Sequence, residues 1–137
     1  MMEWDRLKTT SLLSILLMTF HLADDTVRAP AGTREAGSAN IPALLILAVW
    51  LYGALVLGGR RSGHVVMLLG SLLGVSVALV HMMRSTGMVG GWPATAGEAW
   101  WFVWTTITLG VTASFGVLLA LRELWRGRTR VPRPVEP

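Results

Sequence analysis

The chain has 137 residues, of which 53% are hydrophobic and 15% are charged, and it contains no cysteine. This composition is too apolar and too poor in charge for an average soluble domain, so it predicts a lipid bilayer as the solvent. The lack of cysteine excludes disulfides, thiolate metal sites and cysteine nucleophiles. The formal net charge of +4 comes from basic residues at the ends of apolar runs. Such positions indicate membrane topology rather than nucleic-acid binding.

Four apolar runs predict four transmembrane helices in a single domain of residues 1–121. The expected spans are about 7–23, 41–59, 64–83 and 98–121, followed by a basic, proline-rich tail over 122–137. A span needs roughly 17 to 25 residues to cross the hydrocarbon, so the first run is at the short limit. It could also be a secretory signal, but Pro30 and His21 disturb the two candidate cleavage positions and favour a retained helix.

The distribution of Lys and Arg predicts the orientation. One side of the four spans carries nine of these residues and the other side carries three. The nine are Arg6, Lys8, Arg60, Arg61, Arg122, Arg126, Arg128, Arg130 and Arg133, and the three are Arg28, Arg34 and Arg84. Because basic loops stay in the cytoplasm, the sequence predicts an all-α, four-helix up-and-down bundle of the cytoplasmic (inner) membrane with both termini inside.

This topology gathers six polar residues in the outer leaflet. They are His21, Asp24 and Asp25 at the end of the first span, His81 and Arg84 at the end of the third, and Glu98 at the start of the fourth. The first three share one helix face because they are spaced i, i+3 and i+4. A stripe of small residues, Gly70, Gly74 and Ala78, predicts that the third helix packs closely on that side and that His81 points into the bundle.

The outward cluster has a structural and a functional interpretation. In the structural one, its charges mark where helices leave the membrane, with Asp25 and Arg84 as an ion pair. In the functional one, His21, Asp25 and His81 form the core of a site that Asp24, Arg84 and Glu98 tune. His64, beside two arginines at the opposite end, is expected to contact headgroups.

Two cofactors suit the cluster. Two imidazoles with carboxylates would bind zinc, copper or non-haem iron, with His21, Asp24, Asp25 and His81 as the candidate metal ligands. Alternatively, His21 and His81, or a histidine with Met82 or Met83, would be the axial ligands of a b-type haem, held between first and third helices that lie diagonally in the ring. No tight ligand motif such as HExxH occurs.

Transport and assembly are two further functional hypotheses. A proton or cation could pass Glu98, Asp25 and a threonine line on the fourth helix, or a lipid-like ligand could bind in the outer half. The threonine line, expected to face the other helices, is Glu98, Trp101, Thr105, Thr108, Thr112 and Phe115. An accessory subunit would instead dock on a membrane partner, or on a second copy, through Gly70, Gly74 and Ala78. No nucleophile-elbow motif occurs, so the sequence predicts a binding or accessory subunit with no catalytic residues.

Overall fold

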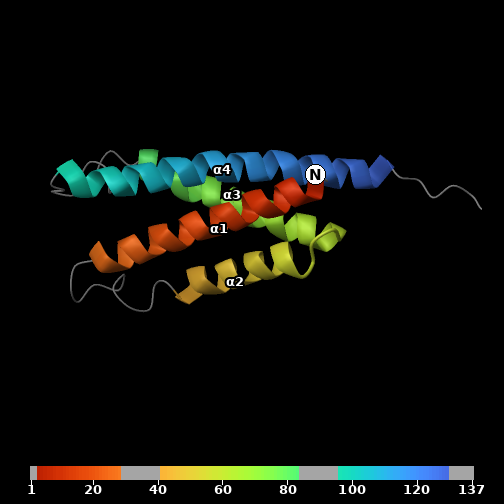
Figure 1. The fold of residues 1–137 in the computed structure, drawn as a ribbon, viewed down its shortest axis with the longest axis horizontal. Coiled ribbons are helices and arrows are strands. Elements are labelled where there is room, and N and C mark those ends of the chain that lie inside the picture. The colour runs from red at the N-terminus through yellow and green to blue at the C-terminus, as the bar shows by residue number, and fades with distance from the viewer. Residues whose placement is uncertain (1–2, 29–40, 84–95, 130–137) are drawn as a thin grey trace, which may run out of the picture.

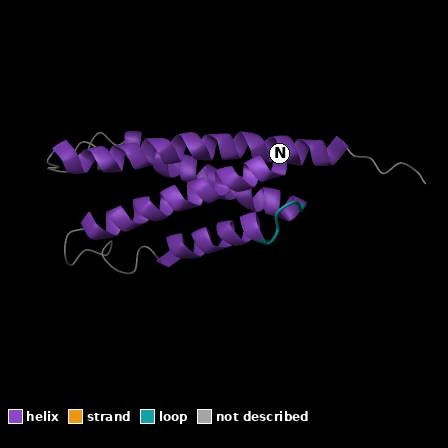
Figure 2. Ribbon diagram, in the orientation of Figure 1, coloured by secondary structure: helices purple, strands orange, loops and turns teal. Residues whose placement is uncertain are grey.

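The computed structural model describes residues 3–28, 41–83 and 96–129, and in this part of the chain every regular element is a helix (Figures 1 and 2). The helices are α1 (Glu3–Arg28), α2 (Ile41–Leu55), α3 (Arg61–Met83) and α4 (Ala96–Thr129). Successive helices run in opposite directions, so α1 and α3 start at the end of the molecule where α2 and α4 finish (Figure 1). The predicted all-α class and the four helices are confirmed.

Several helix ends differ from the expected spans, and α1 extends beyond residues 7–23 at both ends, from Glu3 to Arg28. Helix α2 ends at Leu55 rather than at residue 59, because the amides of Val56 and Leu57 both donate to the carbonyl of Tyr52, at 2.8 and 3.3 Å, and the chain turns. Gly59 completes this turn with a φ of 79°, a backbone conformation that favours glycine. Helix α4 continues to Thr129, eight residues past Leu121 and into the segment expected to form the tail.

Two of the helices contain segments that could cross a membrane by length and hydropathy. These segments are Arg61–His81, with 21 residues, and Trp101–Arg126, with 26 residues. Helix α2 is equally apolar but has only 15 residues, which gives a length of about 22 Å against roughly 30 Å of hydrocarbon.

The four helices form a ring, and the diagonally opposite helices α1 and α3 are also in contact. Helix α3 packs on α2 and α4, and α1 packs on α2, α4 and also on α3, whereas no Cα atoms in the described parts of α2 and α4 lie within 8 Å of each other. The core runs along the inner faces of the helices and includes Leu7, Met18, Trp50, Met67 and Leu109. Contact between α1 and α3 decides the geometry of the predicted site, because both helices carry histidines.

Small residues set the distance between α3 and α4. A methyl group on Gly74 would lie 2.9 Å from Cβ of Ala113, and one on Gly110 would lie 2.8 Å from Cβ of Ala78. On the other side of α3, Gly70 lies against the indole ring of Trp50. The small-residue stripe therefore packs inside the chain, and self-association through it stays a prediction.

The inner face of α4 is not the threonine line that the sequence suggested. Trp101 and Phe115 of that line are 56% and 57% exposed. Thr105 is the one described side chain of the line that is buried, and most of the buried face is formed by Phe102, Thr106, Leu109, Ala113, Gly116 and Ala120. Thr105 and Thr112 satisfy their hydroxyls within α4, by donating to carbonyls three and four residues earlier at 2.8 to 3.1 Å. They therefore need no partner helix, and the smaller residues allow the closer approach.

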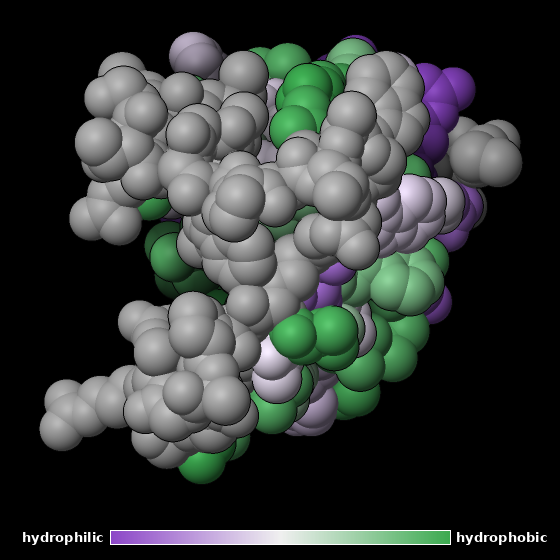
Figure 3. Space-filling model, turned by 90° about the vertical axis from the view of Figure 1, so that its left-hand side faces the viewer, coloured by the Kyte–Doolittle hydropathy of each residue, from purple (hydrophilic) through white to green (hydrophobic). Residues whose placement is uncertain are grey.

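Large apolar side chains lie on the exterior as well as in the core. Large apolar side chains face outward, including Leu45 at 64% and Leu118 at 63% exposure, while Ser11, Ser14 and Ser71 are fully buried. Apolar side chains cover much of the lower flank of the bundle in Figure 3. Extensive exposed apolar surface of this kind favours contact with an apolar partner, whether lipid or protein.

Candidate functional site

His21 of α1 and His81 of α3 lie edge to face in the interior, and we call them the histidine pair. Their ring centroids are 4.8 Å apart and their planes are inclined by 87°. Phe102 of α4 lies against both rings, with centroids 5.1 Å from His21 and 5.5 Å from His81. Only 1% of His21 is exposed. The structure thus brings together the two histidines that the sequence singled out, and His81 points into the bundle as expected.

Heptad-like spacing explains why the two histidines meet. The buried positions of α1 advance by alternate steps of four and three residues from Leu7 to His21. The buried positions of α3 advance in the same way from His64 to Ala78, and the next step of three reaches the partly buried His81. Such steps keep a side chain on one helix face. Because α1 and α3 start at the same end and run in the same direction, their inner faces reach the same level with one histidine each.

A hydrogen bond within α3 fixes the tautomer of His81. Its Nδ1 lies 2.8 Å from the carbonyl oxygen of Val77. A carbonyl can only accept, so Nδ1 carries the proton and donates it, and the neutral ring keeps its lone pair on Nε2. Nε2 is buried and has no hydrogen-bond partner among the described residues. This is the arrangement of a metal-binding histidine, which usually donates its other ring nitrogen to a carbonyl or a carboxylate.

The centroid separation of the pair is closer to that of two imidazoles on one metal ion than to that of the two axial ligands of a haem, and from the edge-to-face arrangement one ring must turn before both nitrogen lone pairs point at a common ion. Two imidazoles bound to one tetrahedral ion, with metal–nitrogen bonds of about 2.0 to 2.1 Å, have ring centroids roughly 5 Å apart. The observed separation is 4.8 Å. A haem would have its axial imidazoles on opposite faces of the macrocycle. Rings this close, with Phe102 against both, would have to move apart to admit it.

The other predicted site residues add less. Asp24 is partly buried one helical turn after His21. Arg84 and the side chains of Asp25 and Glu98 lie outside the described residues, so their predicted roles stay predictions. Among the described residues no three His, Asp or Glu side chains gather closely enough to hold a metal ion. The described part of the site is therefore a pair of imidazoles.

The bundle also contains buried polar groups to which the sequence reasoning gave no role. Ser11, Ser14, Ser71 and Thr106, which we call the hydroxyl group set, have buried side-chain oxygens with no hydrogen-bond partner among the described residues. His64, expected to contact headgroups, is only 8% exposed, and its Nε2 is buried. That expectation was wrong because His64 begins the inner face of α3, a position that the step of seven residues to Ser71 could have revealed.

Comparison with protein-family models, curated proteins and solved structures finds no match for this chain. Its function is therefore inferred from the histidine pair and its surroundings.

Proposed function

We propose that this chain is a four-span integral membrane protein that binds a transition-metal ion at the histidine pair, acting as a binding or accessory subunit. The observation that carries the proposal is the close approach of His21 and His81, with the lone pair of His81 Nε2 buried. Imidazole nitrogen is a good ligand for zinc and copper. Two protein nitrogens leave coordination positions open for a carboxylate, water or a partner's ligand, which suits metal handling better than a closed structural site.

The apolar exterior supports the membrane part of the proposal. Outward-facing leucines, valines and isoleucines would contact acyl chains, while the buried hydroxyls and histidines are shielded from them. Helix α2 can complete a span only if the turn that follows it reaches the interface, or if the bilayer thins around it.

Charge supports an orientation with both termini in the cytoplasm. Most of the basic residues in the described segments gather at the end where α1 and α3 start. They are Arg6, Lys8, Arg60, Arg61, Arg122, Arg126 and Arg128, whereas Arg28 ends α1 at the opposite end. The histidine pair is near the opposite end, so under the positive-inside rule it would lie in the outer leaflet of the cytoplasmic membrane.

A metal titration of the detergent-purified protein tests the function. We expect one Zn²⁺ or Cu²⁺ per chain by calorimetry, and an affinity lower by more than about tenfold in His21→Ala and in His81→Ala, because each variant removes one of two nitrogen ligands. His64→Ala is the matched control, since it removes a buried histidine on the same face of α3. Equal loss in all three variants, or no stoichiometric binding by the wild type, would refute the proposal.

The hydroxyl group set favours a second candidate, passage of protons or small cations through the bundle. Its four buried oxygens belong to the inner faces of α1, α3 and α4, and the inner face of α3 runs from His64 at one end to His81 of the histidine pair at the other. Such a polar interior could hold a chain of water molecules. Proteoliposomes containing a pH-sensitive dye would reveal a proton flux, and Ser71→Val should abolish it. Liposomes as tight as protein-free ones would exclude this function.

A further inference from the structure

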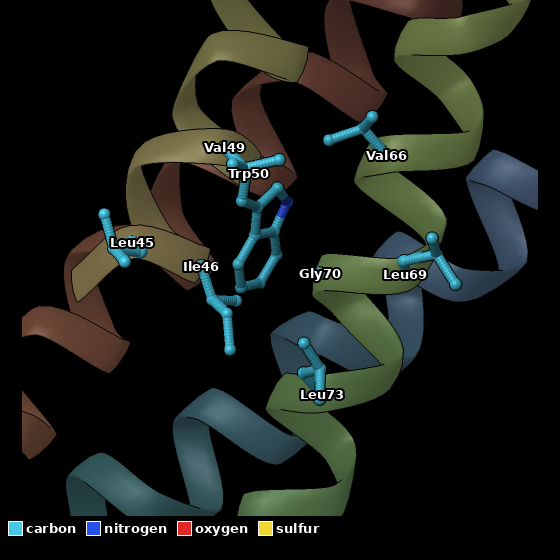
Figure 4. A pocket seen from close by; sticks show the side chains of 8 residues that line it. All are labelled: Leu45, Ile46, Val49, Trp50, Val66, Leu69, Gly70 and Leu73. Atoms are coloured by element: carbon cyan, nitrogen blue, oxygen red, sulfur yellow. The ribbon is translucent and has the colours of Figure 1, made fainter. Parts of the chain in front are cut away.

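A groove between α2 and α3 opens on the apolar exterior, away from the histidine pair. Its volume is about 280 Å³, and it is lined entirely by apolar or aromatic residues of the two helices (Figure 4). Ile46 and Leu73 border one part and Val66 another, with the indole of Trp50 between them. This volume is close to the lower limit of about 300 Å³ for small-molecule sites.

Trp50 gives this groove a single polar group. The side chain is 2% exposed, and its ring lies against Gly70, where any larger residue would overlap it. The indole nitrogen points into the space between α2 and α3, toward Val66 (Figure 4). Nε1 is buried and has no hydrogen-bond partner among the described residues. The aliphatic side chains around it cannot accept a hydrogen bond, so the indole N–H of Trp50 lacks an acceptor in apolar surroundings.

We propose that the groove binds a small lipophilic carbonyl compound, such as a ketone or a quinone, whose oxygen accepts the hydrogen bond of Trp50 Nε1–H once a neighbouring side chain of the groove wall turns aside to expose this buried atom. The apolar walls would hold the hydrocarbon body, and the indole would select molecules that carry an acceptor. A plain acyl chain fills such a groove but leaves the donor unpaired. Inside a bilayer no water can replace the missing acceptor, which strengthens the selection.

The test compares two probes of nearly equal shape, 2-acetylnaphthalene and 2-ethylnaphthalene, of which only the first has a carbonyl. The protein contains seven tryptophans, whose indole N–H resonances can be followed by ¹H–¹⁵N NMR in nanodiscs made from ether lipids. The Trp50 resonance is identified by its absence in Trp50→Phe. We expect the ketone to shift this resonance downfield and to bind about threefold to tenfold more tightly than the hydrocarbon, as a hydrogen bond of ordinary net strength implies.

Three variants separate the outcomes. Trp50→Phe should bind both probes with the affinity of the hydrocarbon, whereas Trp101→Phe, which removes an exposed indole, should keep the preference. Leu69→Trp fills the groove from its exposed rim without touching Trp50, and it should abolish binding of both probes. Equal affinities in the wild type, a preference that survives Trp50→Phe, or binding unaffected by Leu69→Trp would each overturn the proposal.

Phospholipid esters are the other source of carbonyl oxygens, and the choice of lipid distinguishes them. If the Trp50 resonance already lies downfield in ester-lipid nanodiscs and the ketone no longer moves it, the occupant is a phospholipid and the proposal is wrong. If the resonance is the same in ester and ether lipids and responds to the ketone in both, the small carbonyl compound is supported.

Discussion

Substituting Gly74 by alanine tests how closely α3 and α4 pack. The new Cβ would lie 2.9 Å from Cβ of Ala113, whereas carbon atoms in good contact are about 3.5 to 4.0 Å apart. The two helices must therefore separate by roughly 0.6 to 1 Å at this level, because both atoms are attached directly to backbones. Overpacking of this kind destabilises a protein by about 1 to 3 kcal/mol.

Helix propensity acts in the opposite direction and has to be separated out. Alanine is favoured over glycine in a helix by about 0.8 to 1 kcal/mol, so the net effect of Gly74→Ala should be smaller than the steric term. A double-mutant cycle with Ala113→Gly removes this contribution, since the propensity terms cancel in the coupling energy. Ala113→Gly alone loses a buried methyl, and Gly74→Ala with Ala113→Gly restores one methyl between the helices.

Thermal or denaturant unfolding in detergent measures the cycle. We expect the double variant to be more stable than the sum of the single variants predicts, by about 1 to 3 kcal/mol. Additive single effects would mean that the two positions do not touch, and that α3 and α4 do not pack through them. Gly110 and Ala78 provide an independent copy of the experiment one helical turn away.

Three further predictions address the turn, the site and the interior. Gly59→Ala should reduce stability by about 1 kcal/mol because its φ is 79°, while Gly58→Ala, where φ is not positive, should have a smaller effect in the same unfolding assay. Phe102→Ala should lower stability by about 3 to 5 kcal/mol and weaken metal binding, since this ring contacts both histidines. Trp101→Ala, on the exposed face, should do neither. Equal effects of the two substitutions would mean that α4 turns the face with Trp101 and the threonines toward the other helices. Ser71→Ala should leave stability unchanged or raise it if its buried oxygen is dry, and a loss of more than about 1 kcal/mol would instead reveal a hydrogen bond to buried water.

The sequence predicts the helices well because their signals are local and strong. Apolar runs and glycine breaks identified four helices, and the small-residue stripe on α3 correctly turned His81 inward. Contact between α1 and α3 could not be predicted, because in a ring of four helices either pair of opposite helices can pack together. Which pair does so depends on residues of several helices at once, including Gly74 and Ala113.

The face of α4 shows why polar residues can mislead. Threonines at helical spacing suggested an inner face, yet their hydroxyls bond to their own backbone carbonyls and gain nothing from a neighbouring helix. The inner face follows Gly110, Ala113 and Gly116, which allow close approach. His64 was similarly misread from its two neighbouring arginines, although its spacing from Ser71 and His81 places all three on one face.

X-ray absorption spectroscopy of the zinc-loaded protein examines the ligands of the metal directly. Binding at the histidine pair predicts two imidazole nitrogens at about 2.0 to 2.1 Å from the zinc, with the remaining ligands light oxygen or nitrogen atoms. In the His21→Ala/His81→Ala double variant this imidazole scattering should vanish, whereas it should persist in His64→Ala. A zinc coordinated only by oxygen, or an imidazole signal that survives the double variant, would contradict a metal site at the histidine pair.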